Sequence, residues 1–369
     1  MSTPSSRGNS GTPGSSGRPG NSGAGRAPRP HRRPKKDPAR IVAFRALRAV
    51  DERDAYANLI LPSLLREAEQ KGMDRRDAAL ATELVYGTLR LQGTYDAIIA
   101  ACIDRPLSKV DPPVLDVLSL GAHQLLTTRI PSHAAVSATV ELARVVLGDG
   151  KAKFVNAVLR RISAHDLDGW IEQVAPPYDK DAEDHLAVVH SHPRWVVSAL
   201  WDSLGRWQPD ASGRTAVEEL LRADNERPEV TLVARPGRAT VGELADALPE
   251  ATPGRWSPFA LRRRPEARWR RRPADVAAFG PLQRDLLRSA IEATRVGGVV
   301  GYATCSPHLA ETRAVVDDVL RGEGGRVEWV DARPLLPGVP ALGDGPDVQL
   351  WPHLHGTDAM YLALLRRTS

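Results

Sequence analysis

The chain has 369 residues, 42% of them hydrophobic, and a formal net charge of +5. This length predicts two or three domains, and the apolar content is enough to form buried cores. The two cysteines, Cys102 and Cys305, argue against a disulfide scaffold and favour a reducing, cytoplasmic setting. Because no charge-free apolar run approaches the ~18 residues of a membrane span, and no apolar segment follows the basic N-terminus, we expect neither membrane insertion nor secretion.

The positive charge is concentrated at the N-terminus. Residues 1–36 contain eight Lys or Arg and no acidic residue, among many Gly, Ser and Pro; the other residues contain 42 basic against 45 acidic ones. This composition cannot bury apolar surface, so we predict a disordered basic arm over residues 1–38. Such an arm binds phosphate backbones non-specifically, although a solubilising leader without a partner explains it equally well.

Residues 39–163 have the periodicity of an all-α bundle. Apolar residues recur at helical spacing in two stripes, Val136, Val140, Ala143 and Leu147, and Val155, Val158, Leu159 and Ile162. Gly and Pro residues divide the stretch into about six or seven helices. Cys102 lies in an apolar run and is expected in the core. Away from the last stripe lie Lys153, Asn156, Arg160 and Arg161, which either face RNA phosphates or form a solvated face.

The middle of the chain is more polar. Residues 164–192 carry Pro176-Pro177 and many acidic side chains, which predicts a linker. Residues 193–260 predict a small α+β subdomain. Its expected elements are a helix from Pro193 to about Leu204, a second helix ending near Leu221, a strand at Val230–Val233 and a helix from Val241 to Leu248.

Cys305 follows the most strand-like run of the C-terminal region. The β-branched run that starts at Val299 predicts a buried parallel strand, and Ser306-Pro307 with the apolar positions after it predicts the start of a helix. Ligands bind at the carboxyl ends of such strands, and a helix N-terminus lowers the pKa of a thiol, so this turn suits a nucleophile. The alternative is a thiol packed like a small hydrophobic side chain.

The other C-terminal elements are a helix at Pro281–Thr294, a strand at Arg326–Val330 and a strand pair near Val348–Trp351 and Met360–Leu365. Before them runs a dense cluster of arginines that either contacts RNA or forms an exposed loop: Arg262, Arg263, Arg264, Arg268, Arg270, Arg271 and Arg272, with Trp269 interleaved. His353, His355 and Asp358 are too few and too loosely spaced to predict a metal site.

Several of these segments resemble one family. The tract Tyr302–Pro307 resembles the Thr-Cys-Ser motif of the RsmB (Sun) type of ribosomal RNA cytosine-5 methyltransferases. Segments 261–269 and 351–361 resemble other parts of their catalytic domain, and residues 39–163 are similar to their NusB-like RNA-binding domain, most clearly at Glu83–Arg90 and Phe154–Arg161. The resemblance implies a multidomain protein: an all-α NusB-like domain, a small α+β subdomain and, over residues 261–369, a Rossmann-like α/β methyltransferase domain.

The resemblance also implies a chemistry and a departure from it. Family enzymes add a cysteine thiolate to C6 of cytosine so that C5 attacks the methyl group of S-adenosyl-L-methionine, and Cys305 corresponds to the attacking thiol. However, Ala260 is followed directly by Leu261, where the family has the first, cofactor-binding half of the α/β domain, roughly 100 residues. We therefore expect a truncated domain with an open sheet edge.

Two functions follow. One is an S-adenosylmethionine-dependent rRNA cytosine-5 methyltransferase, impaired or inactive as written; the other is a non-catalytic NusB-like RNA-binding protein. The expected partner is ribosomal RNA or another structured RNA.

Overall fold

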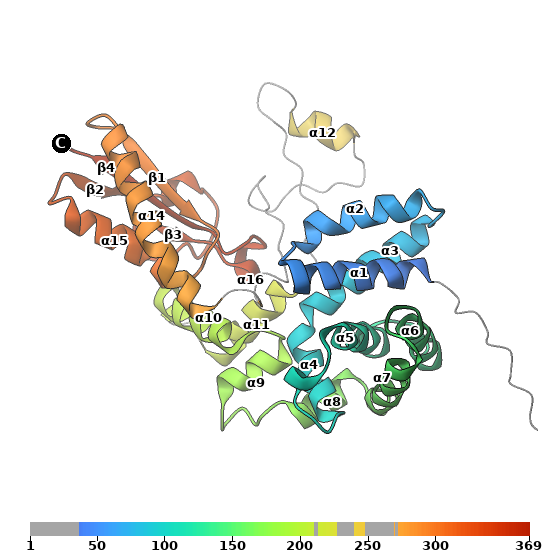
Figure 1. The fold of residues 1–369 in the computed structure, drawn as a ribbon. Coiled ribbons are helices and arrows are strands. Elements are labelled where there is room, and N and C mark those ends of the chain that lie inside the picture. The colour runs from blue at the N-terminus through green and yellow to red at the C-terminus, as the bar shows by residue number, and fades with distance from the viewer. Residues whose placement is uncertain (1–36, 210–212, 227–239, 248–268, 270–271) are drawn as a thin grey trace, which may run out of the picture. The chain divides into compact units, whose positions relative to one another are not determined.

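The computed structural model describes residues 37–209, 213–226, 240–247, 269 and 272–369 (Figure 1). Residues 1–36 of the predicted basic arm and the strand predicted at Val230–Val233 lie outside these residues, whereas Asp37 caps the first helix and Pro38 begins it. None of the described helices combines the length and the apolar character needed to cross a membrane.

The first part of the chain is an all-α bundle, drawn from blue to green in Figure 1. Its α-helices are α1 (Pro38–Arg53), α2 (Ala57–Glu69), α3 (Arg75–Arg90), α4 (Gln92–Ala101), α5 (Pro112–Thr127), α6 (Ser132–Leu147) and α7 (Asp149–Ile162). This confirms the predicted number. The second predicted stripe is fully buried and the first is buried or partly buried, because helical spacing places each stripe against the other helices. Cys102 is in the core, as predicted, with 2% of its surface exposed.

A buried histidine, His123, packs between helices of this bundle. His123 of α5 is 2% exposed, and its Nδ1 lies 2.9 Å from the Tyr95 hydroxyl of α4 and 2.8 Å from Thr127 Oγ1. Burial lowers the pKa of His123 to about 4, so the ring is neutral at pH 7. The ring fits against α3 only because residue 87 is a glycine: a Cβ there would lie 2.2 Å from His123 Cε1.

We therefore expect Gly87→Ala to destabilise the protein. Overpacking a filled core costs about 1–3 kcal/mol, and the higher helix propensity of Ala, up to about 1 kcal/mol, offsets only part of it. Urea unfolding followed by circular dichroism measures the difference. Gly150→Ala in α7 is the control, because a Cβ at that position meets no atom within 4 Å. If Gly87→Ala unfolds at the same urea concentration as wild type, His123 does not fix this packing.

The segment predicted as a linker contains two helices. These are α8 (Leu167–Val174) and α9 (Ala182–Val189). Trp170 of α8 joins the core of the bundle, and its indole N–H donates to the Ile162 carbonyl at 2.8 Å. Leu186 of α9 is fully buried in a second core. The sequence analysis missed these two helices because a few large apolar side chains, spaced within a polar sequence, are sufficient to bury one face of a short helix. The linker at residues 164–192 stays a prediction.

The next helices lead to the C-terminal region. They are α10 (Arg194–Trp207), α11 (Arg214–Asp224) and α12 (Val241–Ala247), which agree with the helices predicted from sequence. α10 and α11 share the second core with Trp351, which is fully buried. The domain boundaries at residues 163, 192 and 260 remain predictions.

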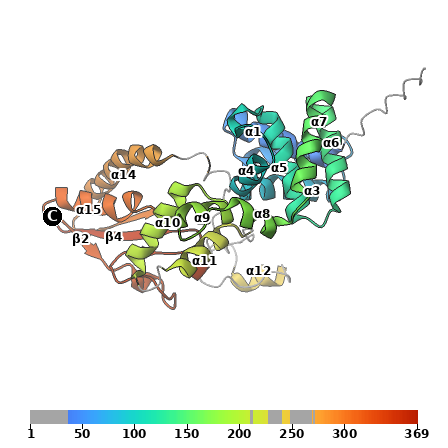
Figure 2. The same ribbon diagram turned by 90° about the horizontal axis from the view of Figure 1, so that it is seen from below.

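The C-terminal region is a small sheet with helices on one face (Figure 2). Its elements are α14 (Pro273–Ala293), β1 (Val299–Thr304), α15 (Arg313–Gly322), β2 (Val327–Val330), β3 (Val348–Gln349), α16 (Pro352–His355) and β4 (Tyr361–Arg367). The strand order is β1-β4-β2, with β3 also paired to β4, and every pair is antiparallel. Apolar side chains of α14 and α15 pack on the face that carries Val300, Ala363 and Leu365.

This arrangement corrects the prediction for β1. The strand is neither parallel nor fully buried: it pairs antiparallel with β4, and Val299, Gly301 and Ala303 are exposed. The reason is that β4 is its only neighbour among the described strands, and only one face of the sheet is covered by described helices. Within the described chain, β1 therefore has an open edge.

Candidate active site around Cys305

Cys305 is the first residue after β1, and its side chain is exposed. The residue before it, Thr304, pairs with Tyr361 at the start of β4. The thiol is therefore held at the end of an ordered strand and remains accessible. Its exposure argues against the alternative that it packs like a small hydrophobic side chain.

The predicted helix N-terminus is not at Cys305. The chain continues through a short 3-10 turn at Leu309–Glu311, and α15 begins only at Arg313. Partial burial of the thiol, followed by the negative charge of Asp358, raises the pKa of Cys305 above its ordinary value. The expectation of a lowered pKa was wrong because the N–H groups of α15 lie too far along the chain and the nearby charge is an acid. At neutral pH the thiol is mainly protonated.

Glu311 fixes the loop that follows Cys305. Its Oε2 accepts a hydrogen bond from Ser306 Oγ at 2.7 Å, and its Oε1 accepts one from Gln283 Nε2 of α14 at 3.2 Å. Its carbonyl accepts the hydroxyl of Tyr302 at 2.8 Å. From α10, Ser203 Oγ donates to the carbonyl of Pro307 at 2.5 Å. These contacts attach the loop to two helices, so the backbone around the thiol is well anchored.

A second network holds the strand beside the thiol. The carboxylate of Asp347 is fully buried; it accepts from Tyr361 Oη at 2.8 Å and from Arg313 Nη1 at 2.6 Å. Tyr361 is opposite Thr304, and Arg313 is the first residue of α15. The network therefore joins β4 to the helix that follows the Cys305 loop.

Sequence reasoning missed these supporting residues. Glu311 could have been suspected from its position shortly after Ser306-Pro307, whereas Ser203 and Asp347 come from distant parts of the chain and carry no local signal. Asp358 was considered only as a metal ligand. Both ring nitrogens of His355 contact the backbone: Nδ1 accepts a hydrogen bond from the Trp351 N–H, and Nε2 lies 2.9 Å from the Pro340 carbonyl oxygen. No group of three potential metal ligands occurs within the described residues.

The predicted RNA-binding residues of α7 divide into two groups. Lys153 and Arg160 are exposed and form no ion pair with the described residues. Asn156 and Arg160 also line a hollow of about 510 Å³ between α6 and α7, together with Arg144 and His133. Arg161 differs, because its guanidinium donates to the Cys102 carbonyl at 2.8 Å and anchors α7 to the end of α4. The predicted Arg262, Arg263, Arg264 and Arg268 lie outside the described residues.

Comparison with known proteins agrees with both parts of the chain. Residues 37–164 match the NusB family, and residues 257–366 match the family described as 16S rRNA methyltransferase RsmB/F. The crystal structure of PH0851 has a TM-score of 0.66 at 15% identity and covers 90% of this chain and 99% of its own, which supports the fold.

A NusB-type bundle followed by a methyltransferase region with an exposed cysteine defines the class of multidomain rRNA methyltransferases. A putative methyltransferase of Mycobacterium tuberculosis (strain H37Rv) is 41% identical over 461 aligned positions, which cover 92% of this chain and 98% of the relative. This chain belongs to the RsmB/F family of rRNA methyltransferases. The probable ribosomal RNA small subunit methyltransferase B of Bacillus subtilis is 34% identical over 217 positions, covering 58% of this chain and 44% of that protein.

The mycobacterial alignment also bears on the length of the chain. Ninety-two per cent of 369 residues is about 340, so about 120 of the 461 positions have no counterpart in this chain. That is the size of about four βαβ-type units at ~30 residues each, and it is close to the part that the sequence predicts to be absent.

The family uses S-adenosylmethionine, and the described residues can be tested for a place to hold it. A nucleoside cofactor site of this fold class needs a glycine loop between a strand and the following helix. Here Gly297 precedes β1 and Gly324 and Gly325 follow α15, so none of these three stands after a strand and before a helix. The described residues therefore do not fit the cofactor.

Proposed function

We propose that this chain is a cytoplasmic, ribosomal RNA-binding member of the RsmB/F family that retains the reactive cysteine but is impaired or inactive in methyl transfer. The bundle α1–α7 holds the RNA, with Lys153 and Arg160 contacting phosphates, and Cys305 is the group that meets a cytosine. The observation that carries the proposal is the accessible Cys305 on an anchored loop, within a region whose described residues do not fit the methyl donor.

The step of the family reaction that this chain can still perform is the addition of Cys305 to the cytosine ring. The thiolate of Cys305 donates an electron pair to C6 of cytosine, a C6–S bond forms, and the C5=C6 π pair moves onto C5. Without a donor, C5 takes a proton from water. Loss of a proton from C5 and expulsion of the thiolate then restore the cytosine. Glu311 and Ser203 act as positioning residues, because Glu311 accepts a hydrogen bond from Ser306 Oγ and Ser203 donates one to the Pro307 carbonyl, both in the loop that carries the thiol.

Titration calorimetry with S-adenosylmethionine tests the loss of donor binding. We expect no saturable heat up to about 1 mM donor, which corresponds to a binding free energy weaker than about −4 kcal/mol. The mycobacterial relative serves as the positive control under the same conditions. Saturable micromolar binding would restore the full methyltransferase function and overturn this part of the proposal.

The alternative, a non-catalytic RNA-binding protein, differs in one respect. It assigns no chemistry to Cys305, whereas the proposal assigns it the addition to C6. A measurement of the addition step that needs no donor therefore separates the two functions.

A further inference from the structure

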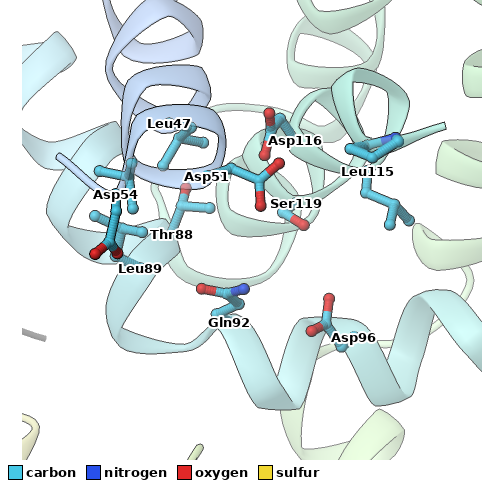
Figure 3. Close-up of a pocket in the computed structure, with 12 residues that line it drawn as sticks. Leu47, Asp51, Asp54, Thr88, Leu89, Gln92, Asp96, Leu115, Asp116 and Ser119 are labelled. Carbon is cyan, nitrogen blue, oxygen red and sulfur yellow. The ribbon is translucent and has the colours of Figure 1, made fainter. Parts of the chain in front are cut away.

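The bundle contains a second feature that the proposed function does not use. A pocket of about 250 Å³ lies between α1, α3, α4 and α5 (Figure 3). Apolar side chains form part of its wall, and the polar lining consists mainly of Asp51, Asp54, Thr88, Gln92, Asp96 and Asp116. Figure 3 shows the carboxylates of Asp51, Asp96 and Asp116 arranged around the same opening.

The negative charge of this pocket is only partly balanced. Arg48 of α1 forms ion pairs with Asp116 at 2.7 Å, with Asp51 at 2.8 Å and with Glu52 at 2.5 Å, so one guanidinium serves three carboxylates. Asp96 of α4 forms no ion pair or side-chain hydrogen bond with any described residue. Burial, followed by the charge of Asp116, raises the pKa of Asp96 to about 7. Burial likewise raises the pKa of Asp116 to about 6.

A buried hydroxyl provides a second, independent observation. Thr88 of α3 lines the pocket and is only 2% exposed. Its Oγ1 is buried and has no hydrogen-bond partner among the described residues. A buried hydroxyl without a partner is unfavourable, and most such groups in native proteins are satisfied by a ligand, a water or a neighbour. In this pocket it offers an acceptor near Asp96, which forms no ion pair with the described residues.

We propose that this pocket is a binding site for an organic cation, an ammonium or guanidinium group on an alkyl chain. The carboxylates of Asp96 and Asp116 pair with the charge, Thr88 Oγ1 accepts one N–H, and the apolar wall contacts the methylene groups. A metal ion fits less well, because no three ligating side chains converge within the described residues. The same chemistry is present in a free polyamine and in an arginine or lysine side chain of a peptide.

Calorimetry on the full chain tests the site, with spermidine as the probe. We expect saturable 1:1 binding that weakens at least tenfold in Asp96→Asn and several-fold in Thr88→Val, both nearly isosteric changes. Asp104→Asn is the matched control, since it removes the same charge from an exposed position of the same domain. Spermidine should also raise the melting temperature of wild type more than that of Asp96→Asn. The melting transition of Asp96→Asn itself shows that the variant is folded.

The charged groups around the pocket predict a pH dependence. They are Arg48, Asp51 and Glu52 on α1, Asp54 at its end, Asp96 on α4 and Asp116 on α5. Since Asp96 and Asp116 must be ionised to bind a cation, spermidine should bind more weakly at pH 5.5 than at pH 8. Affinity that does not fall at pH 5.5 would contradict the assignment.

A peptide with the sequence of residues 26–36, which is rich in Arg and Lys, distinguishes the two sources. Tighter binding of the peptide than of spermidine in the Asp96-dependent mode supports a protein side chain as the natural occupant, and the reverse order supports a polyamine. The proposal is overturned if neither probe binds saturably, or if Asp96→Asn and Asp104→Asn lose affinity equally.

Discussion

Replacing Cys305 by Ala will abolish the exchange of the C5 hydrogen of cytosine in ribosomal RNA, a reaction that needs no methyl donor. Addition of the thiolate to C6 makes C5 basic enough to take a proton from water, so tritium at C5 is released when the adduct collapses. A 16S rRNA transcript with tritium at C5 of its cytosines is the substrate. We expect the rate of tritium release to fall by at least ~100-fold, to that of RNA alone.

The pH profile of this exchange follows from the environment of Cys305. Burial and the charge of Asp358 raise the pKa of the thiol, so the reactive thiolate is scarce at neutral pH and accumulates as the pH rises. The rate should increase about tenfold per pH unit below that pKa. Asp358→Asn removes the negative charge and lowers the pKa, and it should move the rising limb to lower pH.

Two controls make the result specific. Cys102→Ala removes the other cysteine, which is buried in the bundle, and should leave the exchange rate unchanged. Circular dichroism of Cys305→Ala should match wild type because the side chain is exposed. Exchange that persists in Cys305→Ala, or that wild type lacks altogether, removes the proposed role of this thiol and favours the non-catalytic alternative.

The strand before Cys305 was predictable, but the setting of the thiol was not. The apolar run before Cys305 gave a strand, and the structure has one. Its pairing depends on which other strands are present: β4 lies 57 residues further along and runs antiparallel, and local sequence does not encode that neighbour. For the same reason the acid beside the thiol, Asp358, was considered only for a metal site, since its position near Cys305 depends on the path of the chain back to β4.

The helical region was easier to predict because its signals are local. Helical spacing placed Val155, Val158 and Ile162 in the core, and Gly and Pro residues separated the helices. Even so, the stripe alone could not separate Arg161 from Arg160: both residues are exposed, but only the Arg161 guanidinium donates a hydrogen bond to the Cys102 carbonyl. Adjacent positions on one helix surface differ by which neighbouring helix lies within reach.

The second large effect that we expect is a loss of RNA affinity when the exposed basic side chains of α7 are removed. We expect the double variant Lys153→Ala/Arg160→Ala to weaken binding of the 16S rRNA transcript by at least ~10-fold at low salt, because both side chains are exposed, lack ion pairs with the described residues and lie on one side of α7. The plot of log K against log salt has a negative slope, and each lost phosphate contact should reduce the magnitude of that slope by about 0.7–0.9. Gel-shift titrations at several salt concentrations measure both quantities.

The matched control removes the same charge from another helix. The control variant Arg75→Ala/Arg76→Ala removes two exposed side chains at the start of α3. Its RNA affinity and its salt slope should each stay within about twofold of the wild-type values. Arg161→Ala provides a second comparison, because its loss should lower stability more than RNA affinity. If the α3 and α7 variants weaken binding equally, the RNA is attracted by overall charge alone, and α7 is not the contact surface of the bundle.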